Sequence, residues 1–253
     1  MYKKISHLSI VFLLIVLSSC KEETPPIVPV INSDEVKLSF KFNSRYKGFE
    51  TQWNDWNITN AGDTIKLDKV KYILSNFILE KTNGSLISIP NSYAFLSMKD
   101  KPDAFSFNNV PKGSYKSIRF SVGVDSLVNH GNPQQYGATH PLNPAVNDMF
   151  WSWSGGYIFN VVEGYYKNKG SDAGFSFHVA LDVNKRNYSF IQSFEITKDS
   201  KFTFDVNMDK YFSNSINYSL KTDGSFSHSA INDPIMTKFL SNANGVLSLN
   251  TFE

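Results

Sequence analysis

Histidines and tryptophans gather in one stretch of the chain, residues 129–178, where their side chains are able to bind a metal. This stretch holds three of the five histidines and two of the four tryptophans, namely His130, His140, His178, Trp151 and Trp153. Loops held by a rigid scaffold often carry binding sites, and a long loop in a compact domain is usually functional or disordered. The aromatic content of the stretch argues against disorder. We therefore expect a binding loop.

The types of donor in this stretch favour copper. The single cysteine, Cys20, follows an apolar N-terminal run, so the folded part has no thiolate ligand and no disulfide. Imidazole nitrogens suit copper and zinc. Zinc usually takes a tetrahedral ligand set at short sequence spacings, which are absent here. Cuprous copper accepts fewer ligands, so two histidines and one further donor would suffice.

Each of these residues also has an explanation that involves no metal. The pattern FSFHVALD places Phe175 and Phe177 on one face of a strand and His178 on the other, where a surface histidine is ordinary. His130, between Asn and Gly, fits a turn, and the proline after His140 fixes that backbone. The tryptophans can hold a loop onto a sheet through packing alone.

A set of motifs occurs in a fixed order over most of the chain. They are Gly123, Asn129-His130-Gly131-Asn132-Pro133, Pro141-Leu142-Asn143, Met149 to Phe159, Phe175 to His178, and the weaker KYILSNFILEKTNG at Lys71 to Gly84. In these motifs the chain resembles the MbnP-like family, periplasmic or outer-membrane copper proteins linked to methanobactin and to copper-repressible surface proteins. After His178 the chain reads VALDV, where cysteine-containing members often read Gly-Ser-Thr-Gly-Cys.

The resemblance implies a copper site. Its histidine ligands would be His130 and His178, which lie in matched motifs, with His140 next. In the family, a further donor is attributed to a tryptophan that a dihaem, peroxidase-like partner enzyme oxidises to kynurenine. Trp151 and Trp153 lie in the matching motif, although the chain has no Trp-x-His, the spacing of some members. The choice between them stays open, and so does the role of His228 in the stretch FSHSA.

The N-terminus predicts a lipoprotein. Residues 1–19 read as a secretory signal that closes on Leu-Ser-Ser before Cys20, which resembles a lipobox for diacylglycerol attachment. Residues 20–34 form the lipidated cysteine and an extended, proline-rich tether, and residues 35–253 form one domain. We expect an outer-membrane lipoprotein on the periplasmic or the cell-surface face. Lys21-Glu22-Glu23 resembles a surface-export signal, or serves only to solvate the tether.

Charge and motifs exclude several function classes. The chain carries 25 basic and 23 acidic side chains, and removal of Lys3 and Lys4 with the signal leaves 23 of each. A nucleic-acid partner would require a basic excess. The sequence has no nucleophile elbow, no phosphate-binding glycine loop and no His-Glu-x-x-His. We therefore expect no nucleic-acid partner and no enzyme activity.

Hydrophobic residues recur with a period of two, which predicts strands. The alternation is clear at 36–42, 118–122 and 202–208, and turn signals such as Asn83-Gly84, Pro111-Lys112-Gly113 and Asp223-Gly224 separate the strands. The expected fold is all-β, a single-domain antiparallel β-sandwich with long functional loops and one or two short helices. The helices are expected from Asp233-Pro234 to about Ala243, and from Asn143-Pro144 toward Trp153.

The hypothesis that follows is an extracytoplasmic lipoprotein that binds copper for handling or acquisition. The alternative is a surface lipoprotein that binds a glycan or a partner protein through aromatic loops. Trp53 and Trp56, in QWNDWN, suit that alternative because aromatic rings beside Asn and Asp can stack on sugars.

Overall fold

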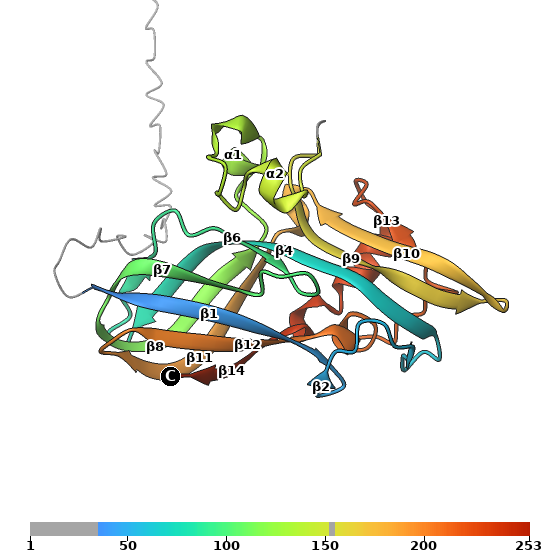
Figure 1. Ribbon diagram of the computed structural model, residues 1–253, viewed down its shortest axis with the longest axis horizontal. Helices are drawn as coiled ribbons and strands as arrows, with labels where there is room; N and C mark the ends of the chain where they lie inside the picture. Colours follow the sequence, from blue (N-terminus) through green and yellow to red (C-terminus); the bar gives the residue numbers. More distant parts are fainter. Residues whose placement is uncertain (1–34, 152–154) are drawn as a thin grey trace, which may run out of the picture.

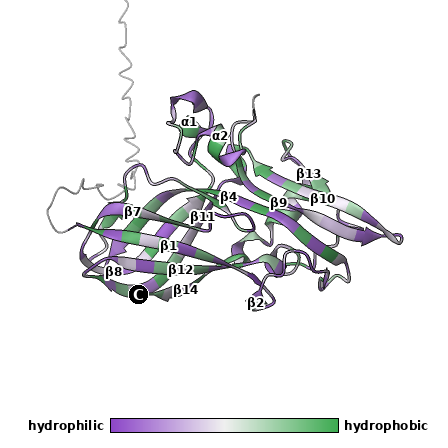
Figure 2. Ribbon diagram, viewed as in Figure 1, coloured by the Kyte–Doolittle hydropathy of each residue, from purple (hydrophilic) through white to green (hydrophobic). Residues whose placement is uncertain are grey.

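The structure is a computed structural model that describes residues 35–151 and 155–253. The predictions for the signal, Cys20, the tether and Trp153 lie outside these residues. The fold is all-β, as predicted: two sheets supply most of the regular structure (Figure 1). Hydrophobic and hydrophilic residues alternate along many of the strands, as period-two patterning requires (Figure 2).

The first sheet has the strand order β14-β12-β1-β2, with β7 also paired to β1. Its strands are β1 (Glu35–Tyr46), β2 (Phe49–Glu50), β7 (Ala104–Pro111), β12 (Ser200–Asn207) and β14 (Leu247–Phe252). β1 and β12 run parallel, with Phe40 beside Phe202 and Phe42 beside Phe204. A purely antiparallel sandwich was predicted, so this pair is a departure. The two strands can run parallel because the long segment of chain that connects them crosses the whole domain.

The second sheet has the order β11-β8-β4-β9-β10-β13, with β3, β5 and β6 also paired to β4. Its strands are β3 (Asn57–Ile58), β4 (Thr64–Lys81), β5 (Leu86–Ser88), β6 (Ala94–Ser97), β8 (Gly113–Val122), β9 (Ile158–Asn168), β10 (Ser171–Ala180), β11 (Arg186–Ile196) and β13 (Phe226–Ser227). β13 runs parallel to β10, the second departure from the predicted antiparallel pairing.

The long strand β4 joins two parts of this sheet. Its first half pairs with β9 and its second half with β8, and the register shifts between Ser75 and Ile78, where Asn76 has a φ of 57°. β9 and β10 extend beyond the region where the two sheets face each other (Figure 1). This extension carries the outer face on which His178 lies.

Aromatic rings fill the space between the sheets. Phe40 of β1 meets Phe77 of β4 edge-on with centroids 5.0 Å apart, and Phe204 of β12 meets Phe120 of β8 at 5.4 Å. Under the extension, the inner face of β10 is covered by the C-terminal segment, where Phe239 stacks on Phe177 at 4.0 Å. Such rings bury large apolar areas and hold the strands of the site in a fixed register.

The helices are short. α1 spans Ser126–Asn129, α2 spans Pro144–Asn147 and α3 spans Pro234–Leu240, and the 3-10 helices are η1 (Pro133–Gln135), η2 (Asp182–Asn184), η3 (Met208–Tyr211) and η4 (Ala243–Gly245). α3 confirms the predicted C-terminal helix: the Asp233 carboxylate accepts from the backbone N–H groups of Ile235 and Met236. The helix predicted from Asn143 toward Trp153 stops at Asn147, because Asp148 turns left-handed with φ 52°. No helix in the described part of the chain is long and apolar enough to cross a membrane.

Candidate functional site: a histidine pair on the outer face of the second sheet

Strand β10 sets the orientation of His178. Phe175 and Phe177 are buried against the C-terminal segment, whereas Ser176 and His178 point to the outer face, as the alternating pattern predicts. The His178 side chain is 16% exposed, so it is largely shielded from solvent although it faces outward.

A carboxylate on the neighbouring strand fixes the His178 ring. His178 Nε2 lies 2.6 Å from Glu163 Oε1 and 3.1 Å from the Ser176 hydroxyl, and Lys69 Nζ lies 2.9 Å from the other oxygen of Glu163. The hydrogen bond from His178, together with Lys69, lowers the pKa of Glu163 to about 2. An ionised carboxylate can only accept, so Nε2 donates, and the lone pair of the neutral ring is on Nδ1.

That Nδ1 atom is buried and has no hydrogen-bond partner among the described residues. Buried polar atoms in proteins are nearly always hydrogen-bonded, and an exception calls for an explanation such as an ion. The arrangement of carboxylate, histidine and free nitrogen is also the usual way in which proteins orient a metal-binding imidazole. His178 is therefore prepared to act as a ligand through Nδ1.

His228 lies directly beside His178. It follows β13, whose Phe226 is in register with Ser176 of β10. The two imidazole rings stack face to face with centroids 4.4 Å apart and planes 2° from parallel. Burial, followed by the proximity of His178, lowers the pKa of His228 and so favours the neutral form, which is the form that binds metals.

Hydrogen bonds from β10 hold the segment around His228 in place. The Ser229 hydroxyl donates to the carbonyl of His178 at 2.8 Å and accepts from the N–H of Ala180 at 2.9 Å. Two residues after β13, this side chain thus ties the His228 segment to the backbone of the strand that carries His178. Ser227 donates to the Asp233 carboxylate that caps α3.

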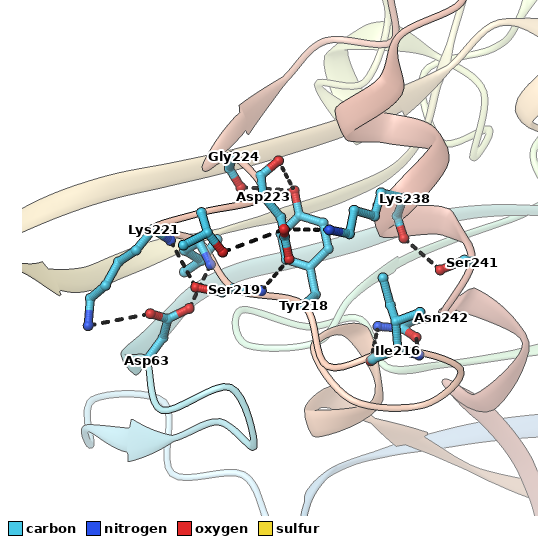
Figure 3. Close-up of polar contacts among 12 residues, drawn as sticks. Asp63, Ile216, Tyr218, Ser219, Lys221, Asp223, Gly224, Lys238, Ser241 and Asn242 are labelled. Atoms are coloured by element: carbon cyan, nitrogen blue, oxygen red, sulfur yellow. Dashed lines mark hydrogen bonds and ion pairs between the residues drawn. The ribbon is translucent and has the colours of Figure 1, made fainter.

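The approach to β13 is anchored by a second polar network (Figure 3). Asp223 accepts from the N–H of Ser219 at 2.9 Å and pairs with Lys238 of α3, while Tyr218 donates to the carbonyl of Gly224 at 2.9 Å. The buried carboxylate of Asp63 accepts from the N–H of Leu220 at 2.6 Å. These contacts join the loop before β13 to both the N-terminal half and the last helix.

Trp151 completes the cluster. Its ring centroid lies 6.2 Å from that of His178 and 5.9 Å from that of His228. The indole packs over Gly155, where a Cβ would lie 2.5 Å from a ring carbon, and the backbone N–H of Trp151 donates to the carbonyl of Gly156. The close packing keeps the indole beside the two imidazoles.

The other predicted ligands have separate surroundings. His130 is 52% exposed, and its Nε2 lies 3.2 Å from Asp182. His140 stacks on Tyr136 at 4.5 Å, and its Nδ1 accepts from the N–H of Leu142. Burial lowers the pKa of His140. These two contacts of His140, with Tyr136 and Leu142, are with residues near it in the chain. That His130 is a ligand remains what the family resemblance implies, and the histidine pair described above does not include it.

Two further observations bear on the alternatives. In residues 35–151 and 155–253, no group of three or more His, Cys, Asp or Glu side chains is arranged to hold a metal ion. Trp56 lies under the ammonium groups of Lys66 and Lys167, at 5.2 and 4.1 Å, and Trp53 packs against the core. Both therefore have packing roles.

Comparison with known proteins agrees with this architecture. A family model described as MbnP matches residues 34–231, which include both histidines of the pair. The solved structure of MbnP from Methylosinus trichosporium has the same fold, with a TM-score of 0.58 and 19% identity over 82% of this chain and 88% of that chain. No curated protein sequence matches significantly.

Proposed function

The chain belongs to the MbnP family, a methanobactin-associated and copper-related family, and on that premise we propose that it is an extracytoplasmic lipoprotein that binds copper for handling or acquisition. His178 and His228 would hold the metal, with Trp151 or an oxidation product of it as a further donor. The observation that carries the proposal is the buried, unpartnered Nδ1 of His178 in a ring that stacks on His228 at 4.4 Å.

The residues of the pair fit cuprous copper. Imidazole is a good donor for this ion, which is stable with few ligands. Glu163 orients His178 from behind, and burial favours a neutral His228, which is the form that binds a metal. Bound copper would be a redox-active or exchangeable ion. The protein would select the metal, shield it and orient its ligands.

Trp151 is the tryptophan of the matched motif that the structure describes, and it lies beside both imidazoles. We propose it as the site of the oxidation that the family resemblance implies. A dihaem, peroxidase-like partner would catalyse the reaction with peroxide as the oxidant. Cleavage of the indole C2–C3 bond takes one oxygen atom from each of two peroxide molecules, which leave as water, and hydrolytic loss of C2 as formate then frees an aryl amine that can donate to copper.

Copper titration of the purified chain tests the proposal. We expect one cuprous ion per chain in competition with a chromophoric chelator, and nitrogen ligands in the X-ray absorption spectrum. Peptide mass spectrometry of native material should place any modification on the Trp151 peptide. No binding by native material would contradict the copper function, and stoichiometric binding without nitrogen donors would contradict the histidine site.

The lipoprotein part of the proposal has its own test. Labelled fatty acid should be incorporated into the wild-type chain in cells, and Cys20→Ala should abolish incorporation. Label that persists in the alanine variant would rule out the lipobox.

A further inference from the structure

A hollow of about 300 Å³ lies on the outer face of β9, β10 and β13, next to the histidine pair. Tyr165 of β9 and Phe226 of β13 form its walls, and Gly174 and Ser176 of β10 form its floor. The two walls stand on strands that flank β10, about 10 Å apart as two interstrand spacings. We call this hollow the ring slot.

The walls of the ring slot are large aromatic rings that are only partly covered. The Lys66 ammonium lies 5.1 Å from the centroid of the Tyr165 ring, and the His228 ring lies 4.3 Å from that of Phe226. Phe226 is 59% exposed and Tyr165 is 43% exposed. Exposed aromatic rings provide stacking surfaces for a flat ring. Scattered exposed apolar residues are common, but Tyr165 and Phe226 border one hollow, because Tyr165 pairs with Gly174 and Phe226 pairs with Ser176, two residues further along β10.

The floor contains a glycine that the fold does not require. At Gly164, also in the floor, a Cβ would collide with the carbonyl of Lys66 at 2.2 Å, so packing alone explains that glycine. At Gly174 the backbone is ordinary strand, and a Cβ would meet nothing nearer than the Gly164 carbonyl at 4.0 Å. A glycine inside a strand weakens it and often marks a place where a ligand approaches the backbone.

The charged groups of the ring slot are already engaged, which narrows the ligand class. Glu163 is paired with Lys69 and with His178, and Asp68 is paired with Lys99. A sugar would need free carboxylates or amides to bind its hydroxyl groups, in addition to an aromatic platform. A flat apolar ring needs only the walls and the open floor.

We propose that the ring slot binds a planar aromatic or heteroaromatic ring of a small organic ligand. The ring slot adjoins the histidines, because the Phe226 ring lies 4.3 Å from that of His228 and the Ser176 hydroxyl 3.1 Å from His178 Nε2. A bound heteroaromatic ring with a nitrogen donor would therefore exchange copper with His228. This second step rests on the proposed copper function, whereas ring binding itself does not.

Ligand-observed NMR of the metal-free chain tests ring binding, with 1,7-phenanthroline as a flat probe whose nitrogens cannot chelate. We expect binding to the wild type and about tenfold weaker binding to Gly174→Val and Phe226→Ala, because the first fills the floor and the second removes a stacking wall. Thr203→Val, which adds a valine to a strand of the other sheet, is the matched control and should bind like the wild type.

Copper measurements on the same variants separate this inference from the proposed function. Gly174→Val should keep the copper affinity of the wild type but transfer copper to 1,10-phenanthroline several-fold more slowly. Equal binding of 1,7-phenanthroline by wild type and Gly174→Val would overturn the ring slot even if copper binds. Binding of methyl glucoside in place of the flat probe would also overturn it. Loss of copper binding with intact ring binding would contradict only the copper function and the exchange step.

Discussion

His178 and His228 stack face to face with ring centroids 4.4 Å apart, although 50 residues separate them in the chain. The contact depends on the parallel pairing of β13 with β10 and on Ser229, whose hydroxyl bonds the His178 carbonyl and the Ala180 N–H in the last residues of β10. The site is thus a product of tertiary structure. His178 lies on a strand and His228 directly follows one, and regular elements keep their geometry better than loops do.

Glu163 should control how well His178 binds copper. Replacement with Gln removes the charge that holds the Nε2–H tautomer, so we expect copper affinity to fall about 10- to 100-fold, as for other residues that support a metal ligand. Chelator competition measures this change. Glu80→Gln, which alters another paired carboxylate on the same sheet, is the control and should leave the affinity unchanged. Equal affinities for Glu163→Gln and wild type would remove Glu163 from the site.

Gly156, which lies close to Trp151, should tolerate substitution poorly. Its φ is 67°, and a Cβ would lie 2.3 Å from the side-chain oxygen of Asn129, which accepts from the N–H of Tyr157. Gly156→Ala should therefore lower the free energy of unfolding by about 2–4 kcal/mol, through steric overlap added to backbone strain.

Gly170→Ala is the matched control for this prediction. Gly170 also has a positive φ, 83°, but nothing lies within 4 Å of its Cβ position. Backbone strain alone should cost about 1 kcal/mol. Urea denaturation of both variants measures the difference in their free energies of unfolding. Similar decreases for the two variants would show that Asn129 moves aside at little cost.

The ion pair of Asp223 and Lys238 should make part of the stability dependent on pH. The hydrogen bond from Lys238, followed by that from the Ser219 N–H, lowers the pKa of Asp223 below its usual value of 3.8. Because the folded-state pKa is the lower one, this contribution is complete above pH 3.8 and is lost as the pH falls through the folded pKa.

Asp223→Asn should therefore lower the midpoint of thermal unfolding at neutral pH, and the gap to the wild type should narrow in acid. Scanning calorimetry at several pH values measures the gap. A gap that stays constant down to strong acid would mean that the charge of Asp223 contributes nothing.

Sequence patterns of a few residues correctly predicted strands, turns and helix starts, because these elements depend mainly on neighbouring residues. The alternation in 202–208 gave a strand with buried Phe202 and Phe204, and FSFH placed His178 opposite Phe177. Asn83-Gly84 forms the expected turn, with the Gly84 N–H bonded to the carbonyl of Lys81. Asp233-Pro234 begins the expected helix because Asp233 caps it.

The remaining features depend on contacts between distant segments. The sequence around His228 is polar and irregular, and only the pairing of β13 with β10 brings that ring to His178. The parallel pairing of β1 with β12 joins strands that are far apart in the chain. The helix after Asn143 ended early because Asp148 adopts a left-handed conformation, which aspartate tolerates better than most residues and helical spacing does not reveal.

Cuprous affinity of single-histidine variants tests the central claim most directly. His178→Ala, His228→Ala, His130→Ala and His140→Ala are each compared with the wild type by chelator competition, and thermal unfolding of the metal-free forms checks that they fold. The account predicts that affinity collapses in the His178 and His228 variants and is retained in the other two. Retained affinity in either of the first two, or a collapse confined to His130→Ala, would contradict the histidine pair as the copper site.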